Sequence, residues 1–243
     1  MPTQNRTRRM LPDGTPLHNR LLGALTAADY ARIRPHLRMH NAVVGRALHE
    51  HGAPVTSVYF PNGGVYSVTN QMRDGALVEV ATVGREGMLG VGVFFGDRAG
   101  TGRTFQQVPD GPLPSLAAGR FVRESAAGSF HDVVALYAQA HLLQVMQSAA
   151  CNALHDLTQR CCRWLLQTQD RVESPELFLK HEFLAIMLGV HRPTVTAVLG
   201  TLQHAGWIAS RYGRIEVLKR RRLEAAACEC YEVTRAHFDR LGL

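Results

Sequence analysis

The spacing of apolar residues changes from strand-like to helical along this 243-residue chain. Between residues 55 and 83, β-branched and aromatic residues cluster or alternate with polar ones in the runs VTSVYF, GVYSVTNQM and ALVEVATV. Turn-forming stretches such as Arg73–Gly75 separate these runs, which predicts short strands in a β-roll or barrel. Before them, LLGALTAADYARIRPHL predicts one short amphipathic helix with Thr26 as an internal cap.

A long helical pattern follows the strand-like region. From Phe130 to Asn152 apolar residues recur at helical spacing with no Pro or Gly, which predicts about six turns of helix. Its residues fall into two stripes. The first consists of Val134, Ala138, His141, Val145 and Ser148, and the second of Leu136, Leu142, Leu143 and Met146. We therefore expect the helix to pack on its own domain and also on a partner, as a dimer seam; an ordinary buried helix is the alternative.

The stretch HEFLAIMLGVHRPTVTAVLGTL, from His181 to Leu202, has the pattern of a DNA-reading helix-turn-helix. Ala185 lets a second helix pack closely, and Gly189 can adopt the positive φ of a tight turn. Pro193 belongs in the first turn of the second helix, so the turn ends near Arg192. The shared core is expected from Leu184, Leu188, Val190, Val195 and Val198. A helical hairpin of some other helical protein is the alternative.

The next segment, QHAGWIASRYGRIEVL, predicts a β-hairpin. Gly206 ends the second helix, a strand follows around Trp207 and Ile208, and a turn at Arg211–Gly213 leads to a strand through Ile215. An arginine-tipped hairpin directly after such a helix pair is typical of the wing of a winged helix.

Basic residues are concentrated in this same region. Between Lys180 and Arg222, eight basic residues stand against two acidic ones, an excess of +6 out of a formal net charge of +7 for the chain. Such a concentration is expected of a domain that contacts the phosphate backbone of DNA. The run Lys219–Arg222 can equally be a solvated charge run.

Composition and cysteine usage narrow the class of protein. With 46% hydrophobic and 19% charged residues the chain is ordinary for globular domains. No apolar run is long enough to cross a bilayer, and the start MPTQNRTRRM lacks the apolar region of a secretory signal, so we expect a cytoplasmic protein without a membrane partner.

The five cysteines all lie from Cys151 onward and none forms CxxC, so we expect neither a disulfide framework, a structural metal nor a cofactor. Cys161–Cys162 are expected in a core. Cys228-x-Cys230 leaves metal binding or oxidant sensing open.

In this order of parts the chain resembles the Crp/Fnr superfamily of bacterial transcription regulators. The resemblance covers about residues 20–240 and is carried by LTQRCCRWLL, FLAIMLGVHRPTVTAVLGTLQHAGWI and GRIEVL, and more loosely by VYFPNGGVYSVTNQMRDG and VGREGMLGVG. It is especially similar to a branch ending in an LEAAACECY-type helix. The resemblance implies an α+β protein with a cyclic-nucleotide-binding-like β-roll, a long dimerisation helix and a winged helix-turn-helix. The expected parts are a disordered tail (1–19), the β-roll (20–129), the dimerisation helix (130–155) and the DNA-binding domain (156–243).

The resemblance also implies which residues contact DNA. Arg192 takes the place of the family's guanine-reading arginine, a role that suits a guanidinium because it bonds guanine O6 and N7 together. His191 and Thr194 take places that usually hold phosphate, and Arg211 and Arg214 would be wing contacts. His181 and Thr196 complete the expected surface. Pro193 and Ala197 depart from the pattern of many relatives, so the half-site of the best-known members should not be transferred.

The nucleotide pocket of the family is incomplete here. Members that bind cyclic AMP pair a Gly-Glu-Leu turn with an Arg-Ser or Arg-Thr, whereas this chain offers Gly90–Val91–Gly92 and Arg103–Thr104. Valine cannot accept a ribose hydroxyl hydrogen bond, so cyclic AMP is not expected as effector. The pocket residues to examine are Gly90, Val91, Arg103 and Thr104. The N-terminal iron–sulfur cysteines of the oxygen-sensing branch are also absent from the sequence.

The sequence therefore predicts a homodimeric, sequence-specific regulator that binds double-stranded DNA, with RNA polymerase as a candidate protein partner and an effector other than cyclic AMP or none. A small-ligand or cyclic-nucleotide signalling module is the alternative. An enzyme is not expected: a cupin-like metal site would start from His49-Glu50-His51, but Val55 stands where a carboxylate is needed.

Overall fold

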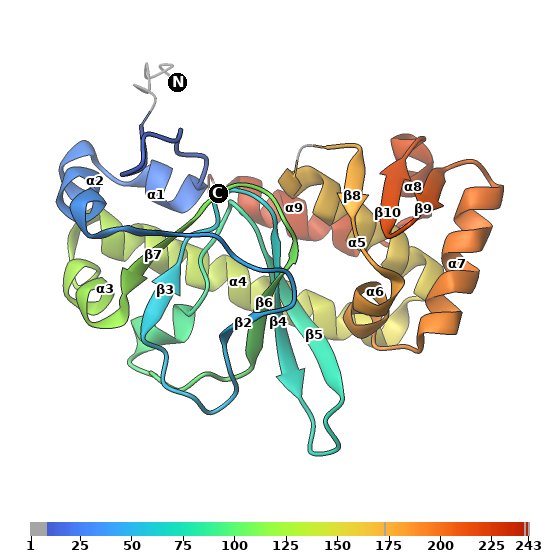
Figure 1. The fold of residues 1–243 in the computed structure, drawn as a ribbon, viewed down its shortest axis with the longest axis horizontal. Coiled ribbons are helices and arrows are strands. Elements are labelled where there is room, and N and C mark those ends of the chain that lie inside the picture. Colours follow the sequence, from blue (N-terminus) through green and yellow to red (C-terminus); the bar gives the residue numbers. More distant parts are fainter. Residues whose placement is uncertain (1–8, 173, 241, 243) are drawn as a thin grey trace.

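The computed structural model describes residues 9–172, 174–240 and 242, and its two domains lie at either end of one long helix, α4 (Gly128–Leu154). Figure 1 shows this helix running behind the β-sheets of the first domain and on to the helices of the second. The predicted helix over Phe130–Asn152 is confirmed, and it extends two residues further at each end.

The first domain is a β-roll with short helices at one end. Its strands are β1 (Arg38–His40), β2 (Ala47–His49), β3 (Ser57–Tyr59), β4 (Val65–Gln71), β5 (Leu77–Val83), β6 (Arg103–Val108) and β7 (Leu113–Ala117). Its helical segments are α1 (Arg20–Ala24), α2 (Ala27–Ile33), η1 (Arg34–His36), η2 (Val91–Phe95) and α3 (Ala118–Glu124). The single helix expected around Thr26 is two helices, because Leu25 and Thr26 are extended and Thr26 is the N-cap of α2. The strands form antiparallel sheets in the orders β1-β7-β3 and β2-β6-β4-β5. The three strand-like runs of the sequence are β3, β4 and β5, so the predicted β-roll is confirmed.

The N-terminal segment is ordered earlier than the sequence indicated. Leu11 is fully buried, and the guanidinium of Arg9 donates hydrogen bonds to the carbonyls of Leu22 (3.0 Å) and Leu25 (2.7 Å) at the end of α1. The expected disordered tail over residues 1–19 is therefore wrong for 9–19, because an apolar side chain and a charged side chain tie this segment to the first domain. Residues 1–8 lie outside the described residues.

The second domain combines five helices and a small sheet within residues 157–240 as described. These are α5 (Leu157–Val172), β8 (Glu176–Phe178), α6 (His181–Leu188), α7 (Arg192–His204), β9 (Ile208–Arg211), β10 (Arg214–Val217), α8 (Arg220–Ala226) and α9 (Cys230–Arg240), with strand order β8-β10-β9. Asp156 caps α5: its Oδ1 accepts from the Gln159 N–H at 3.0 Å, and Gln159 Oε1 accepts from the Asp156 N–H at 3.2 Å.

One of the hydrophobic cores contains residues of both domains. Val65 and Phe105 of the β-roll belong to the same buried cluster as Trp164 and Leu188 of the second domain. The rings of Phe105 and Phe183 lie 6.3 Å apart between centroids, which brings α6 directly onto the four-stranded sheet. The second domain is therefore held against the β-roll by α6 as well as by α4.

The two stripes of α4 have different environments. Val134 and Ala138 of the first stripe are buried, Val134 in the core of the β-roll, whereas Leu142 and Met146 of the second are each 60% exposed. Near the end of α4, Cys151 lies outside the larger cores and packs with Cys228 and Cys230 in a separate buried cluster. Across the described residues no single helix is long and apolar enough to cross a membrane; α6 and α7 pass that test only as a bent pair, on length and composition.

Candidate nucleic-acid interface

Helices α6 and α7 meet at 105° around a turn that begins with Gly189. Gly189 has φ 64°, the left-handed conformation that glycine adopts without strain. His191 is the N-cap of α7 and Pro193 lies in its first turn, where a missing N–H costs no helical bond. The predicted helix-turn-helix is therefore present, with its turn where the glycine and proline placed it.

The faces of this helix pair separate core residues from polar ones. Leu184, Leu188 and Val195 are buried, and Val190 and Val198 pack partly buried against the same cluster. On the opposite side of α7 the side chains are exposed; they belong to His191, Arg192, Thr194, Thr196 and Ala197. The residues expected to contact DNA are thus brought together on the outer face of α7's first two turns.

Arg192 is held by one exposed ion pair. Its Nη1 lies 2.9 Å from Oε1 of Glu182 in the first turn of α6, and both side chains are more than half exposed. An exposed pair of this kind contributes at most about 1 kcal/mol, so it orients the guanidinium without locking it away from a ligand.

His181 and Thr196 are joined to each other. The Thr196 hydroxyl donates to the Arg192 carbonyl (3.1 Å), so it accepts from His181 Nδ1, 3.0 Å away. His181 Nε2 lies 3.3 Å from the Ser210 hydroxyl on β9. The imidazole therefore links α6, α7 and the wing, which makes His181 a residue that positions α7 against the wing.

The wing is a two-residue hairpin. Arg211 and Arg214 are paired across β9 and β10, and the two residues between them, Tyr212 and Gly213, have φ of 50° and 75°. Positive φ at both central positions is the type I′ turn, whose twist matches that of the strands. This turn leaves the Tyr212 ring fully exposed at the tip. Sequence reasoning from charge missed Tyr212, although its position before glycine in a predicted hairpin turn marks it as a tip residue.

The two wing arginines differ in their surroundings. Arg214 Nη1 lies 3.1 Å from Glu176 Oε1 on β8, and its guanidinium carbon lies 4.5 Å above the Phe178 ring. Arg211 is exposed at the end of β9. Arg214 is therefore held along the sheet, while Arg211 stands at the turn.

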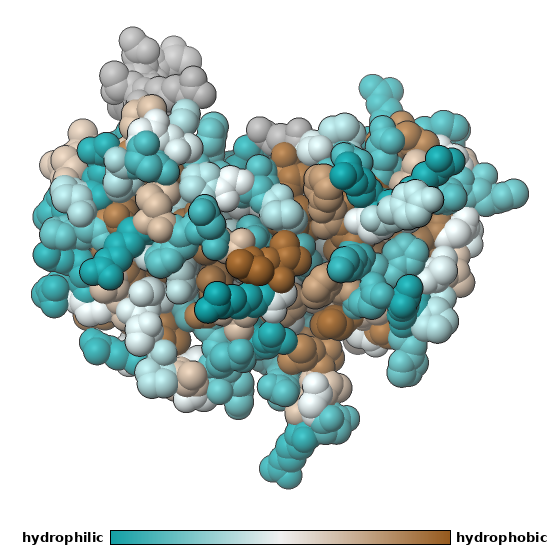
Figure 2. All heavy atoms as spheres, viewed as in Figure 1, coloured by the Kyte–Doolittle hydropathy of each residue, from teal (hydrophilic) through white to brown (hydrophobic). Residues whose placement is uncertain are grey.

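In the basic run Lys219–Arg222, likewise, one side chain is engaged by other residues and the others are exposed. Arg220 lies inside a network, donating to Gln169 Oε1, Asp170 Oδ1 and Tyr231 Oη at 2.6–2.7 Å. The neighbouring basic side chains are exposed, as is that of Lys180; these neighbours are Lys219, Arg221 and Arg222. Figure 2 shows the surface over α7 and the wing, on the right, as mostly hydrophilic.

The predicted effector pocket is only partly assembled. Gly90, Val91 and Thr104 line a cavity of about 90 Å³ between the β-roll and α4. Arg103 does not line it: its Nη2 donates to the Gly45 carbonyl at 3.0 Å, and its guanidinium lies over the Phe105 ring. Neighbouring residues of a strand point to opposite faces, so Thr104 faces the cavity and Arg103 does not. The structure therefore does not bring Arg103 and Val91 to one site.

Two histidines from different elements line this cavity. His49 comes from β2 and His141 from α4. Burial lowers the pKa of both imidazoles, to about 4 for His141. His49 bonds through Nε2 to the Ser57 carbonyl (2.8 Å), whereas His51 bonds to the Thr101 carbonyl (3.3 Å). These carbonyls belong to different segments, Ser57 to β3 and Thr101 to the loop before β6, so the two imidazoles of the His-x-His pair are not directed at one centre.

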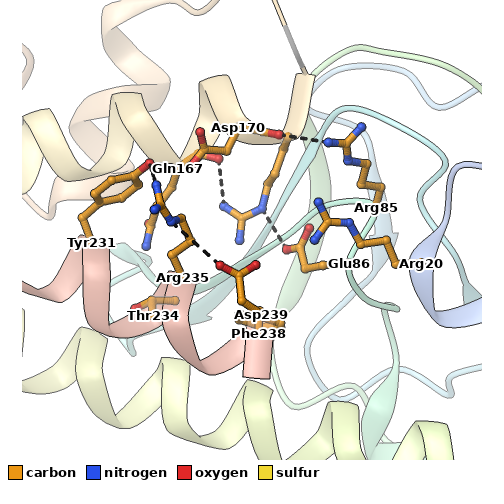
Figure 3. A pocket seen from close by; sticks show the side chains of 11 residues that line it. Arg20, Arg85, Glu86, Gln167, Asp170, Tyr231, Thr234, Arg235, Phe238 and Asp239 are labelled. Atoms are coloured by element: carbon orange, nitrogen blue, oxygen red, sulfur yellow. Dashed lines mark hydrogen bonds and ion pairs between the residues drawn. The ribbon is translucent and has the colours of Figure 1, made fainter. Parts of the chain in front are cut away.

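A second cavity, of about 240 Å³, lies between the domains and is lined by charged side chains (Figure 3). Arg85 donates to the Asp170 carbonyl at 3.4 Å, and Arg235 lies 3.9 Å from Asp239. Burial alone would raise the pKa of Glu86, but the Arg171 guanidinium, 2.8 Å away, and backbone N–H donors hold it below its usual value. The acidic and basic groups of this cavity thus join the turn after β5 to α5.

Comparison with known proteins agrees with the geometry. Residues 159–226 match the Crp-like helix-turn-helix domain. A Crp/Fnr-family regulator from Eubacterium rectale aligns with 85% of this chain and 96% of its own, at 19% identity and a TM-score of 0.65. A Crp-family regulator from Thermus thermophilus aligns over 78% and 96%, at 20% identity and 0.65. The c-di-GMP-responsive regulator CLP of Xanthomonas campestris aligns over 79% and 99%, at 18% identity and 0.63. Comparison with curated sequences gave no match.

These matches confirm the resemblance that the sequence motifs indicated. The second domain is a Crp-like winged helix-turn-helix, and the chain has the α+β fold of the Crp/Fnr transcription regulators, with a cyclic-nucleotide-binding-like β-roll and a long connecting helix.

Proposed function

We propose that this protein is a homodimeric, sequence-specific regulator of transcription in which α7 reads the major groove and the wing contacts the flanking backbone. The observation that carries the proposal is that Arg192 and Thr194 in the first turn of α7, and Arg211 beside the turn of the wing, are all exposed. Arg192 is the base-reading group, because an arginine near the start of a recognition helix can bond both acceptors of guanine. Arg211 contacts phosphate.

The homodimer rests on the uncovered stripe of α4. Leu142 and Met146, each 60% exposed, are accompanied by Leu136 and Leu154 along the same helix. A row of exposed apolar side chains on one helix is buried most simply against the same row of a second copy. Two-fold symmetry would then present two α7 helices to a palindromic site. RNA polymerase as a partner and a cytoplasmic location belong to the same proposal.

The effector is a molecule other than cyclic AMP, or none. The cavity lined by Val91 and Thr104, about 90 Å³, is well below the roughly 300 Å³ at which ligand pockets usually begin. Its one lining carboxylate among the described residues, Asp97, accepts from the Ala99 N–H at 2.9 Å, and its lining does not include Arg103.

The deciding experiment is selection of bound sequences from random DNA duplexes by the full-length protein. We expect an enriched palindrome with half-sites about one helical turn apart, about 10 base pairs centre to centre. Arg192→Ala should lose the enrichment, and Arg222→Ala serves as a matched exposed-arginine control away from α7. Failure of the parent protein to enrich any sequence, with its fold intact, would overturn the proposal.

A further inference from the structure

Three cysteines and one histidine meet at the joint between α4 and the DNA-binding domain. Cys151 lies in the last turn of α4, His155 is the residue that ends this helix, Cys228 lies in the loop after α8, and Cys230 begins α9. One ligand atom from each of these four residues lies within 4.8 Å of the other three. Residues about 75 positions apart in the chain are thus gathered into one polar cluster that none of the DNA contacts uses.

The separations fit a tetrahedral metal ion. Cys151 Sγ lies 3.5 Å from Cys228 Sγ, and Cys230 Sγ lies 3.5 Å from His155 Nδ1. Bonds of about 2.3 Å to sulfur and about 2.0 Å to nitrogen place ligand atoms roughly 3.5–3.8 Å apart in a tetrahedron. These two separations match the tetrahedral values, and the other ligand atoms lie within 4.8 Å of one another, so the four side chains face a common centre.

Residues that contact the cluster offer the hydrogen bonds that metal ligands usually receive. His155 Nε2 lies 3.1 Å from Oε2 of Glu229, so the carboxylate fixes the ring with Nδ1 free to coordinate. Gln147 Nε2 donates to Cys230 Sγ at 3.0 Å, which stabilises a thiolate. Three thiolates around a divalent ion leave one net negative charge, which the Arg163 guanidinium, in electrostatic interaction with Cys151, offsets.

We propose that Cys151, His155, Cys228 and Cys230 form a structural site for one Zn²⁺ ion per chain. Three sulfurs and one imidazole are the ligand set of closed structural zinc sites, with no position left for water. On binding, the thiols release protons and form four coordinate bonds together with the imidazole, and nothing is oxidised or reduced. The site would link the end of α4 to the start of α9. It would thereby fix the orientation of the DNA-binding domain relative to α4.

A Cys151–Cys228 disulfide is the competing use of the same residues. It would remove two of the four ligands and leave Cys230 and His155 facing each other without a role. The Glu229–His155 contact and the Gln147–Cys230 bond favour the metal, because both act on the two residues that a disulfide does not need.

The test is metal analysis of the full-length protein purified under reducing conditions. We expect one Zn²⁺ per chain by mass spectrometry and, after removal with a chelator, titration with Co²⁺ to give the visible bands of a tetrahedral ion and a thiolate charge-transfer band. Cys230→Ser should abolish the one-to-one binding. Cys162→Ser, a buried cysteine in the core of α5, is the matched control and should bind as the parent does.

Glu229→Gln keeps the proposal falsifiable if cysteine variants fold poorly, because Glu229 is exposed and not a ligand. We expect it to weaken Zn²⁺ binding about 10- to 100-fold while keeping the tetrahedral Co²⁺ spectrum. The proposal is wrong if reduced parent protein binds neither ion at micromolar concentration, if Cys230→Ser binds as tightly as the parent, or if the protein is isolated as a metal-free Cys151–Cys228 disulfide.

Discussion

Trp164 of α5 donates a hydrogen bond of 3.0 Å from its indole Nε1 to Oε1 of Glu79 on β5. The other carboxyl oxygen of Glu79 accepts from the Ser67 hydroxyl at 2.7 Å, and all three residues are buried. Glu79 is thus a polar group inside the core that joins the two domains. Burial raises its pKa to about 7, against the hydrogen bonds from Ser67 and Trp164 that lower it.

Glu79 makes stability depend on pH. The pKa of Glu79 is about 7 in the folded protein, against an ordinary value of 4.5. Between these two pH values the folded protein keeps the proton on Glu79, whereas the unfolded chain releases it. This stabilisation is complete below about pH 4.5 and is lost as pH rises through 7. The free energy of unfolding of Glu79→Gln should therefore increase relative to that of the parent as pH rises through this range, by at most about 3 kcal/mol.

Chemical denaturation of both proteins between pH 5 and 8 measures that difference. His141 contributes with the opposite sign, because its lowered pKa makes stability rise with pH, but it is present in both proteins and cancels. Glu216→Gln, at an exposed position, is the control and should follow the parent. Parallel curves for Glu79→Gln and the parent would contradict the assignment.

Arg192→Ala should remove sequence discrimination and leave the fold unchanged, because the side chain is exposed and makes one surface ion pair. A bidentate arginine–guanine contact is worth about 1–3 kcal/mol, or roughly ten- to a hundredfold in affinity for the selected site. Affinity for unrelated DNA should change much less. Binding assays on the selected site and on scrambled DNA decide it, and an equal loss on both would refute base reading by Arg192.

Arg211→Ala should weaken binding to all sequences alike, because a wing arginine at the turn contacts phosphate. The slope of log affinity against log salt concentration should fall by about one for the lost contact. Arg214→Ala should have a smaller effect on this slope, since its guanidinium is engaged by Glu176 and Phe178. A change confined to the selected site would instead make Arg211 a base-reading residue.

Leu142→Asp should shift the protein from dimer to monomer and weaken operator binding. The substitution would place a charge in the apolar stripe of α4 that we expect to be buried against the second copy. Sedimentation at micromolar concentration measures the change. Val122→Asp, on an exposed part of α3, is the control and should leave the mass unchanged. A monomeric parent protein that still binds a palindrome would rule out the α4 seam.

Cyclic AMP should not bind at micromolar concentration. The pocket has Val91 where a ribose-holding carboxylate is needed, and the loss of such a bond costs about 1.5–3 kcal/mol, or roughly ten- to a hundredfold. Arg103 is turned toward the Gly45 carbonyl on the other side of β6. Calorimetric titration of the parent protein checks this expectation, and DNA binding should be measurable without nucleotide. Saturable micromolar binding would show that Arg103 reorients into the pocket.

The local elements of this protein follow from its sequence because their signals are local. The caps at Thr26 and Asp156, the left-handed turn at Gly189 and the start of α7 at Pro193 depend on residues within one turn of each other. The same holds for the exposed Arg192. Such features were predictable from spacing and from the chemistry of single residues.

Only the tertiary structure decided how distant residues meet. Composition could not show that Leu11 would anchor the N-terminal segment, that Arg220 of the basic run would turn inward to Asp170, or that Arg103 would face away from Val91. The sequence determined the elements with a strong local pattern, such as α4, α6, α7 and the wing, and the chemistry each residue offers, because these depend on neighbours along the chain. The cysteine cluster and the Trp164–Glu79 bond required the packing of α4, α5, α9 and the β-roll, because a fold brings together positions that no spacing rule connects.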